Sequence, residues 1–262
     1  MNKIYAALWA EGLKTRRSNV FWLILLFFMF MPLMLVLLMF VQKHPDIGEK
    51  LGMIGTKATL MRFGNPDWPN FLNLINQTMA AIGLIGFGFV ACWIFGREHA
   101  DHTMKDILAL PLSRFYIVLS KFIIVFFWCL ILALVLFIFA MAGGWAIALS
   151  GWSFHIVLIK TCKFLFTTLL TFLLCTPVAF FAGYGRGYLL PMGFVILTLI
   201  LANFIGILGL GPYFPWAVPG IYSIGPGAEG MQLNIFSYII YLLTCIIGLW
   251  STFTWWRYAD QK

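Results

Sequence analysis

Charged side chains are scarce in this sequence. Only 10% of its 262 residues are Asp, Glu, Lys or Arg, whereas 62% are hydrophobic, and the mean hydropathy is +0.95. So few charges cannot cover the surface of a water-soluble globule, and the sequence therefore predicts an integral membrane protein. Six spans of ~20 residues leave no room for a soluble domain of typical size, so we expect residues 1–262 to form a single membrane domain.

The sequence also lacks the motifs of common enzymes and nucleotide-binding proteins. It contains no G-x-x-x-x-G-K-[ST], no H-E-x-x-H and no G-x-S-x-G. An intramembrane lipid- or peptide-processing enzyme, the alternative function, would need a nucleophile with a base, or paired acids, at membrane depth. All acids fall outside the predicted spans, and His155 near Lys160 is the best isolated candidate. An ion-coupled transporter would likewise need an acid within a span.

Cysteine and charge patterns point to no metal, disulfide or nucleic acid. The five cysteines lie in or beside apolar stretches at no metal-ligand spacing, so we interpret them as small buried residues. The net charge of +8 comes from basic residues beside the span ends, where membrane proteins place them. We therefore expect no cofactor on this chain and no nucleic-acid partner.

Six apolar stretches are long enough to cross a bilayer. They lie at about residues 20–41, 72–95, 115–142, 156–182, 188–210 and 238–255. Each is apolar all round, as expected of helices in lipid. Pro32 and Pro177 fall inside spans and predict kinks, while Gly83, Gly86 and Gly88 suggest a close contact between helices.

The distribution of lysine and arginine predicts the orientation. With the N-terminus inside, eleven of these residues fall on the cytoplasmic side and six on the opposite side. The dense Lys14-Thr15-Arg16-Arg17 run before the first span supports this choice. We expect both termini to be cytoplasmic.

Residues 3–17 precede the first span and predict an amphipathic helix in the membrane interface. One face carries apolar side chains and the other carries Glu11, Lys14 and Arg17. Two interpretations are open: an anchor that only sets topology, or an elbow that packs against a cytoplasmic partner. The apolar face includes Tyr5, Leu8, Trp9 and Leu13.

The loop between the second and third spans is the most informative polar segment. Glu98, His99 and the charged residues after them predict a short polar helix, followed by apolar residues that a merely solvated linker would not need. His99 and His102 could bind a metal, but surface histidines explain them more simply, since no third ligand lies nearby in sequence. The residues concerned are Arg97, Glu98, His99, Asp101, Thr103, Lys105, Asp106, Leu108, Leu110, Pro111 and Arg114.

The run from Phe95 to Arg114, followed by Lys121-Phe122, resembles the first cytoplasmic loop of type-2 ABC transporter permeases, in particular the bacitracin-resistance and lantibiotic-immunity branch. The segment 213–219, with its prolines and tryptophan, is similar to one in that branch. Six spans and an N-terminal elbow extend the likeness over nearly the whole chain.

This resemblance implies a permease subunit of an ATP-driven exporter in a prokaryotic cell membrane. It implies two cytosolic ABC ATPase subunits, which hold ATP and Mg²⁺, and a second permease, identical or homologous. The segment from Glu98 to Arg114 would be the coupling helix seated in an ATPase groove. The expected cargo is hydrophobic or amphipathic, such as a peptide antibiotic or a lipid-like compound.

Polar residues near the outer ends of the spans are candidates for cargo or lipid contact. Lysines there can equally extend to the interface, and amides can bond between helices. These residues are Asn73, Asn76, Gln77, Lys160, Lys163 and Asn203. The proline-rich segment 211–237 predicts a re-entrant or interfacial hairpin.

Overall fold

The computed structural model describes residues 3–44, 64–104, 107, 112–225 and 232–258. Within these ranges the regular elements are helices, and an isolated bridge joins Asp67 to Ser150. The expected all-α class is therefore confirmed. The helices are α1 (Lys3–Arg16), α2 (Asn19–Lys43), α5 (Trp68–Ala100), α7 (Arg114–Ala146), α8 (Phe154–Leu173), α9 (Cys175–Tyr184), α10 (Leu189–Ile207), α11 (Val218–Ile224) and α12 (Ile235–Tyr258), with 3₁₀ turns η1 (Gly211–Tyr213) and η2 (Pro215–Ala217).

The six predicted spans are confirmed. In the described chain, α2, α5, α7, α8 with α9, α10 and α12 are each long and apolar enough to cross a membrane. Most extend beyond the predicted bounds, whereas the fifth is shorter and ends at Ile207. The extra turns of α5 matter most, because they carry the helix through Glu98 to Ala100.

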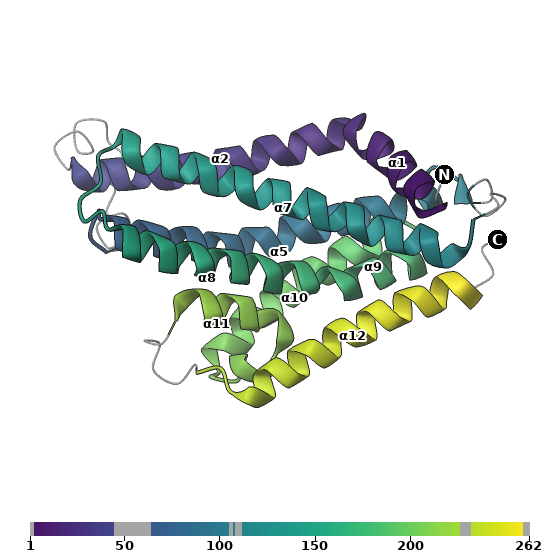
Figure 1. Ribbon diagram of the computed structural model, residues 1–262. Coiled ribbons are helices and arrows are strands. Elements are labelled where there is room, and N and C mark those ends of the chain that lie inside the picture. The colour runs from purple at the N-terminus through teal and green to yellow at the C-terminus, as the bar shows by residue number, and fades with distance from the viewer. Residues whose placement is uncertain (1–2, 45–63, 105–106, 108–111, 226–231, 259–262) are drawn as a thin grey trace.

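The long helices run side by side, and both chain termini lie at the same end of the bundle (Figure 1). At this end α1 turns away from the line of α2 and packs on α7. The short helix α11 lies toward the opposite end and packs on α5 and α8 (Figure 1). The bundle thus has one end where α1 packs on α7, and an opposite end toward which the short helix α11 lies.

Helix α5 is the centre of the bundle. In its most apolar part 78% of residues are buried, against 22% for α2 and 17% for α10. Two of the glycines explain the close packing: a Cβ on Gly86 would clash with the ring of Phe28 on α2, and one on Gly88 would lie 2.7 Å from Val195 on α10. The predicted helix contact at these glycines is confirmed.

The kink predicted at Pro177 divides the fourth span into α8 and α9 at Leu174. Proline has no N–H to donate to the carbonyl four residues earlier, here that of Leu173. The Thr176 hydroxyl lies 3.0 Å from that carbonyl and 2.8 Å from the carbonyl of Cys245, and can donate to either. The break therefore also joins α9 to α12. Pro32, in contrast, lies within a continuous α2.

Prolines also start the short turns of segment 211–224. Pro212, Pro215 and Pro219 each stand in the first or second position of η1, η2 and α11. The missing N–H costs nothing there, because the first N–H groups of a helix have no internal partner. The described part of the predicted hairpin is thus a compact set of short helices, and residues 226–231 lie outside the described chain.

The packing of α9 on α12 generates a first prediction. A Cβ on Gly248 would lie 2.5 Å from the backbone nitrogen of Pro177, which cannot rotate away. We expect Gly248→Ala to destabilise the protein by ~1–3 kcal/mol, the usual cost of overpacking, as a lower melting temperature in detergent. Gly193→Ala on α10 is the matched control, since its Cβ would meet nothing within 4 Å. Equal melting temperatures of the two variants would contradict this packing.

Candidate functional site

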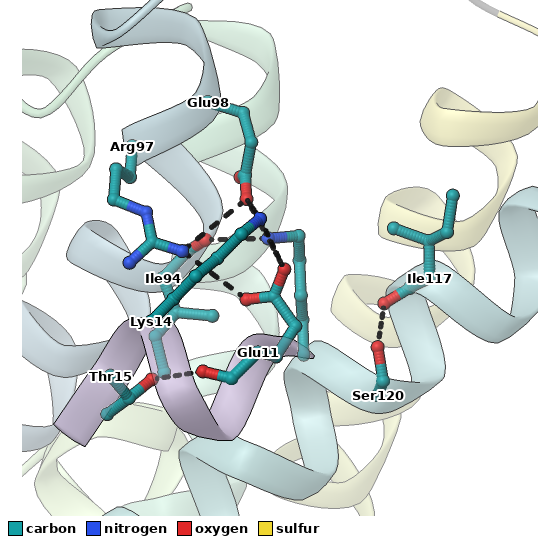
Figure 2. Close-up of polar contacts among 9 residues, drawn as sticks. Glu11, Lys14, Thr15, Ile94, Arg97, Glu98, Ile117 and Ser120 are labelled. Atoms are coloured by element: carbon teal, nitrogen blue, oxygen red, sulfur yellow. Dashed lines mark hydrogen bonds and ion pairs between the residues drawn. The ribbon is translucent and has the colours of Figure 1, made fainter. Parts of the chain in front are cut away.

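A buried ionic cluster joins α1, α5 and α7 at the end of the bundle where the termini lie. It consists of Glu11 and Lys14 on α1, Arg97 and Glu98 on the last turn of α5, and Lys121 on α7. Figure 2 shows the labelled carboxylates and cations pointing toward one another from their separate helices.

Lys121 is the inner cation of the cluster. Its side chain is 0% exposed, and its Nζ lies 2.6 Å from Oε1 of Glu98, itself 1% exposed. The same Nζ donates to the carbonyl of Ile94 at 3.1 Å and lies 3.4 Å from Oε1 of Glu11. Lysine has three donors and a strongly hydrated charge, so full burial requires several acceptors. The two carboxylates and the carbonyl supply them.

Lys14 and Arg97 form the outer part of the cluster. Lys14 Nζ lies 3.3 Å from Glu11 and 3.7 Å from Glu98, and its side chain is 41% exposed. Arg97 Nη2 lies 3.6 Å from Glu11 and 3.8 Å from Glu98, and its guanidinium lies 4.5 Å from the centre of the Trp93 ring. Only the Glu98–Lys121 pair is therefore both fully buried and at short hydrogen-bond distance.

The cluster holds three cations and two carboxylates, so it carries one net positive charge. Burial alone would raise the pKa of Glu11, but the charges of Lys121, Lys14 and Arg97 outweigh it and hold the pKa below its ordinary value. Glu11 is thus a carboxylate at neutral pH.

The structure corrects two sequence-based expectations about acids. The expected short polar helix was to include Glu98 and His99, but both belong to the last turn of α5, and Glu98 is buried. The expectation that Glu98 lies in a loop was also wrong, because α5 extends to Ala100 and buries Glu98, with Glu11 of α1 buried beside it. The carboxylates are bound by three cations, so neither is a free ligand for a transported ion.

Helix α1 exposes most of its apolar face and buries the face that carries Glu11. Tyr5 and Trp9 are 56% and 60% exposed, and Leu13 is also exposed, while Leu8 is half-buried. The buried face carries Ala7, Glu11 and Thr15. In a membrane protein the apolar face can point away from the protein, because lipid accepts it. Sequence reasoning missed this cluster; its signal was Lys121, a charged residue two turns inside the apolar helix α7.

The remaining residues of the predicted coupling segment are only partly described. Asp101 and His102 are exposed, and Thr103 is half-buried. Arg114 is the first residue of α7, and its Nη1 donates to the carbonyls of Trp256 and Arg257 on α12 at 3.2 and 3.0 Å. The other predicted residues, Lys105, Asp106, Leu108, Leu110 and Pro111, lie outside the described residues.

The predicted cargo or lipid contacts fall into two groups. Lys160 on α8 donates to Oδ1 of Asn73 on α5 at 2.6 Å, and Asn76 is buried next to this pair. Lys163 lies one turn further along α8, and its Nζ lies close to Gly225.

Gln77 and Asn203 belong to a different place: they line a cavity of about 430 Å³ between α5, α10 and α11. Within the described chain, no three His, Cys, Asp or Glu side chains come close enough to hold a metal ion.

Comparison with known proteins gives one family and one relative. Residues 7–205 match the model of the ABC-2 family transporter proteins. The chain is 23% identical over 179 residues to the bacitracin transport permease protein BCRB of Bacillus licheniformis. The aligned region covers 68% of this chain and 86% of the relative. No solved structure gives a significant match.

The inner pair of the cluster generates a second prediction. Lys121→Met leaves the buried Glu98 carboxylate without its hydrogen-bonded cation, and losing one partner of a buried pair costs ~3–5 kcal/mol. We expect a strong fall in melting temperature, and Lys121→Met with Glu98→Gln to be less damaging than the sum of the single changes. Lys14→Met, at the exposed rim, should cost ~1 kcal/mol or less. Additive single effects would show that the two side chains are not coupled.

A third prediction concerns acid. Glu11 has a folded pKa below its ordinary value of 4.5, so its contribution to stability is complete above that pH and is lost as the pH falls through the folded pKa. We expect Glu11→Gln to be less stable than wild type at neutral pH and to lose less stability on acidification. Melting curves from about pH 6 to about pH 3 test this. Asp101→Asn, at an exposed carboxylate, is the control and should match wild type throughout.

Proposed function

Because the chain belongs to the ABC-2 family of transporter proteins, we propose that this transport permease drives export with the ATPase activity of a separate chain. Its six spanning helices make it a multi-pass protein of a bacterial cell membrane. No nucleotide-binding P-loop occurs in its sequence, so in this proposal ATP and Mg²⁺ are bound by the partner. Family membership favours transport over the alternative of an intramembrane enzyme.

The observation that carries the proposal is the ionic cluster at the end of the bundle with both termini. In the proposed orientation this end is cytoplasmic, and two ATPase subunits dock there. The segment from Arg97 to Arg114 begins inside the cluster and runs back into α7, so a force on it acts directly on α5 and α7. A second permease, identical or homologous, completes the transporter.

The distances within the cluster suggest which parts move together. Glu98 and Lys121 join α5 to α7 by a short buried bond, whereas the ion pairs of Glu11 with Arg97 and Lys121, which join α1 to α5 and α7, span 3.4–3.6 Å. Coulomb attraction depends less on direction than a hydrogen bond does. In the proposed mechanism α5 and α7 tilt as one body, and α1 follows while its charges remain paired, a rigid-body switch between two arrangements.

The proposed cargo is hydrophobic or amphipathic, such as a peptide antibiotic or a lipid-like compound. The relative's name as a bacitracin transport permease supports this class. The cavity between α5, α10 and α11 adds a structural reason: Gln77 and Asn203 present amide groups in an otherwise mainly apolar lining that includes Leu84, Leu199 and Trp216. Such a mixture suits a ligand with a few polar groups.

The test compares two pairs of leucines, one in the proposed docking segment and one just after α10. Leu108→Ala with Leu110→Ala alters the proposed docking segment, and we expect loss of ATPase co-purification or at least a tenfold lower transport-coupled ATP hydrolysis, about 1.4 kcal/mol or more of coupling. Leu208→Ala with Leu210→Ala is the matched control at the other end of the bundle, where both side chains are exposed. Both proteins should insert equally into membranes.

The proposal of an external ATPase is wrong if the docking-segment variant keeps full partner binding and transport. It is also wrong if the purified permease transports without any nucleotide hydrolase. If both leucine pairs impair transport equally while ATPase binding persists, the docking segment is misassigned.

A further inference from the structure

A large apolar groove lies between the first turns of α7 and the last turns of α12. Its volume is about 1000 Å³. Phe115 stacks on Phe253 with ring centres 5.1 Å apart, and Phe122 lies 6.0 Å from the same ring, so these aromatic side chains form the floor. Leu119, Ile246 and Trp250 line it further along. The groove is separate from the ionic cluster and from the cavity at Gln77.

The groove has the length of one lipid leaflet. Its lining on α12 runs from Ile246 to Tyr258, and twelve residues of α-helix rise ~18 Å. Half of the hydrocarbon core of a bilayer measures ~15 Å. Because α7 and α12 are both long and apolar enough to span a membrane, a groove of this length along them would place its apolar part against acyl chains and its end at the headgroup level.

Positive charge is concentrated at the headgroup end. Arg114 and Arg257 both line the groove there. Arg114 uses only Nη1 for its bonds to the carbonyls of α12, so its Nη2 and Nε donors remain available. Arg257 contacts the ring of Tyr258 at 5.2 Å. Among the described residues, no carboxylate forms an ion pair with either arginine.

The N-terminus of α7 adds to this charge. Ser113 occupies the N-cap position without a side-chain hydrogen bond, and the first turn contains no acidic residue. The first N–H groups of a helix carry partial positive charge and favour an anion. Two guanidinium groups and this helix end thus converge at one end of an apolar groove.

We propose that this groove binds an anionic phospholipid, with the headgroup phosphate on Arg114 and Arg257 and an acyl chain along Phe115, Phe122 and Trp250. Basic pockets between spanning helices suit anionic headgroups, because charge and apolar surface are satisfied together. A second copy of the chain fits less well. A two-fold contact uses the same patch on both subunits and would bring the arginines of the two copies toward one another.

The test measures lipid retention on the purified full-length chain by native mass spectrometry, titrating dioleoyl phosphatidylglycerol or dioleoyl phosphatidylcholine into mild detergent. We expect wild type to retain phosphatidylglycerol preferentially. Arg114→Gln with Arg257→Gln should weaken this retention about 30-fold, since each basic residue near a membrane surface contributes about a fivefold effect. Arg257→Gln alone, which breaks no hydrogen bond of the described structure, should weaken it about fivefold.

Two further variants separate the parts of the proposal. Arg16→Gln with Arg17→Gln removes the same charge from exposed residues at the same end of the bundle and should leave retention unchanged. Leu119→Trp places a larger side chain in the acyl part without touching the arginines and should also weaken retention.

The proposal is overturned by any of three results. The first is that wild type binds both lipids equally. The second is that the Arg114/Arg257 and Arg16/Arg17 double variants weaken retention equally. The third is that the variants at Arg114, Arg257 and Leu119 retain phosphatidylglycerol as wild type does. A change in oligomeric state with unchanged lipid retention would assign the groove to a contact between copies. Because none of these measurements involves the ATPase, failure here leaves the proposed function standing.

Discussion

The attraction between buried opposite charges determines the arrangement at one end of this bundle. Lys121 and Glu98 are fully buried, where a charge without a partner is costly, and they lie 2.6 Å apart. The pair fixes the ends of α5 and α7 together, and Glu11 brings α1 into the same cluster. In lipid the apolar surfaces of helices gain little by meeting one another, so such specific polar contacts define which helices are neighbours.

Elsewhere in the described part of the bundle, the helices are held by close packing at small residues and not by ion pairs. The small residues of α5 allow α2 and α10 to approach closely, as at Gly86 and Gly88. On the other side, Gly248 of α12 lies against the backbone of Pro177, while Thr176 bonds to the carbonyl of Cys245. A bundle of this kind is rigid where backbones touch.

The two ends of the bundle differ in chemistry. The end with both termini carries the ionic cluster and the arginines of the α7–α12 groove, whereas the opposite end holds proline-started turns and the amide-lined cavity. This division agrees with the proposed function, in which the partner docks at one end and the cargo binds toward the other. The proposed phospholipid site also lies on α7, one of the helices that move in the proposed mechanism.

Some features of the site could be read from sequence and others could not. The Arg97–Arg114 segment stood out because charge is rare in this chain, and Pro177 because proline cannot complete a helix. Glu11 gave no comparable signal: on a helical wheel it belongs to the polar face of an amphipathic helix, and a polar face is normally solvated. Only the position of α7 and α5 against that face turns Glu11 into a buried residue.

The sequence alone determined that this protein is a bundle of six membrane-spanning helices, because the length and apolarity of each stretch leave lipid as its only solvent. It could not determine which charged residues meet. Lys121 and Glu98 are 23 positions apart and Glu11 comes from another helix, so their contact depends on how separate helices pack. The tertiary structure decided which charged residues meet, because a charge buried away from water is stable only beside an opposite charge.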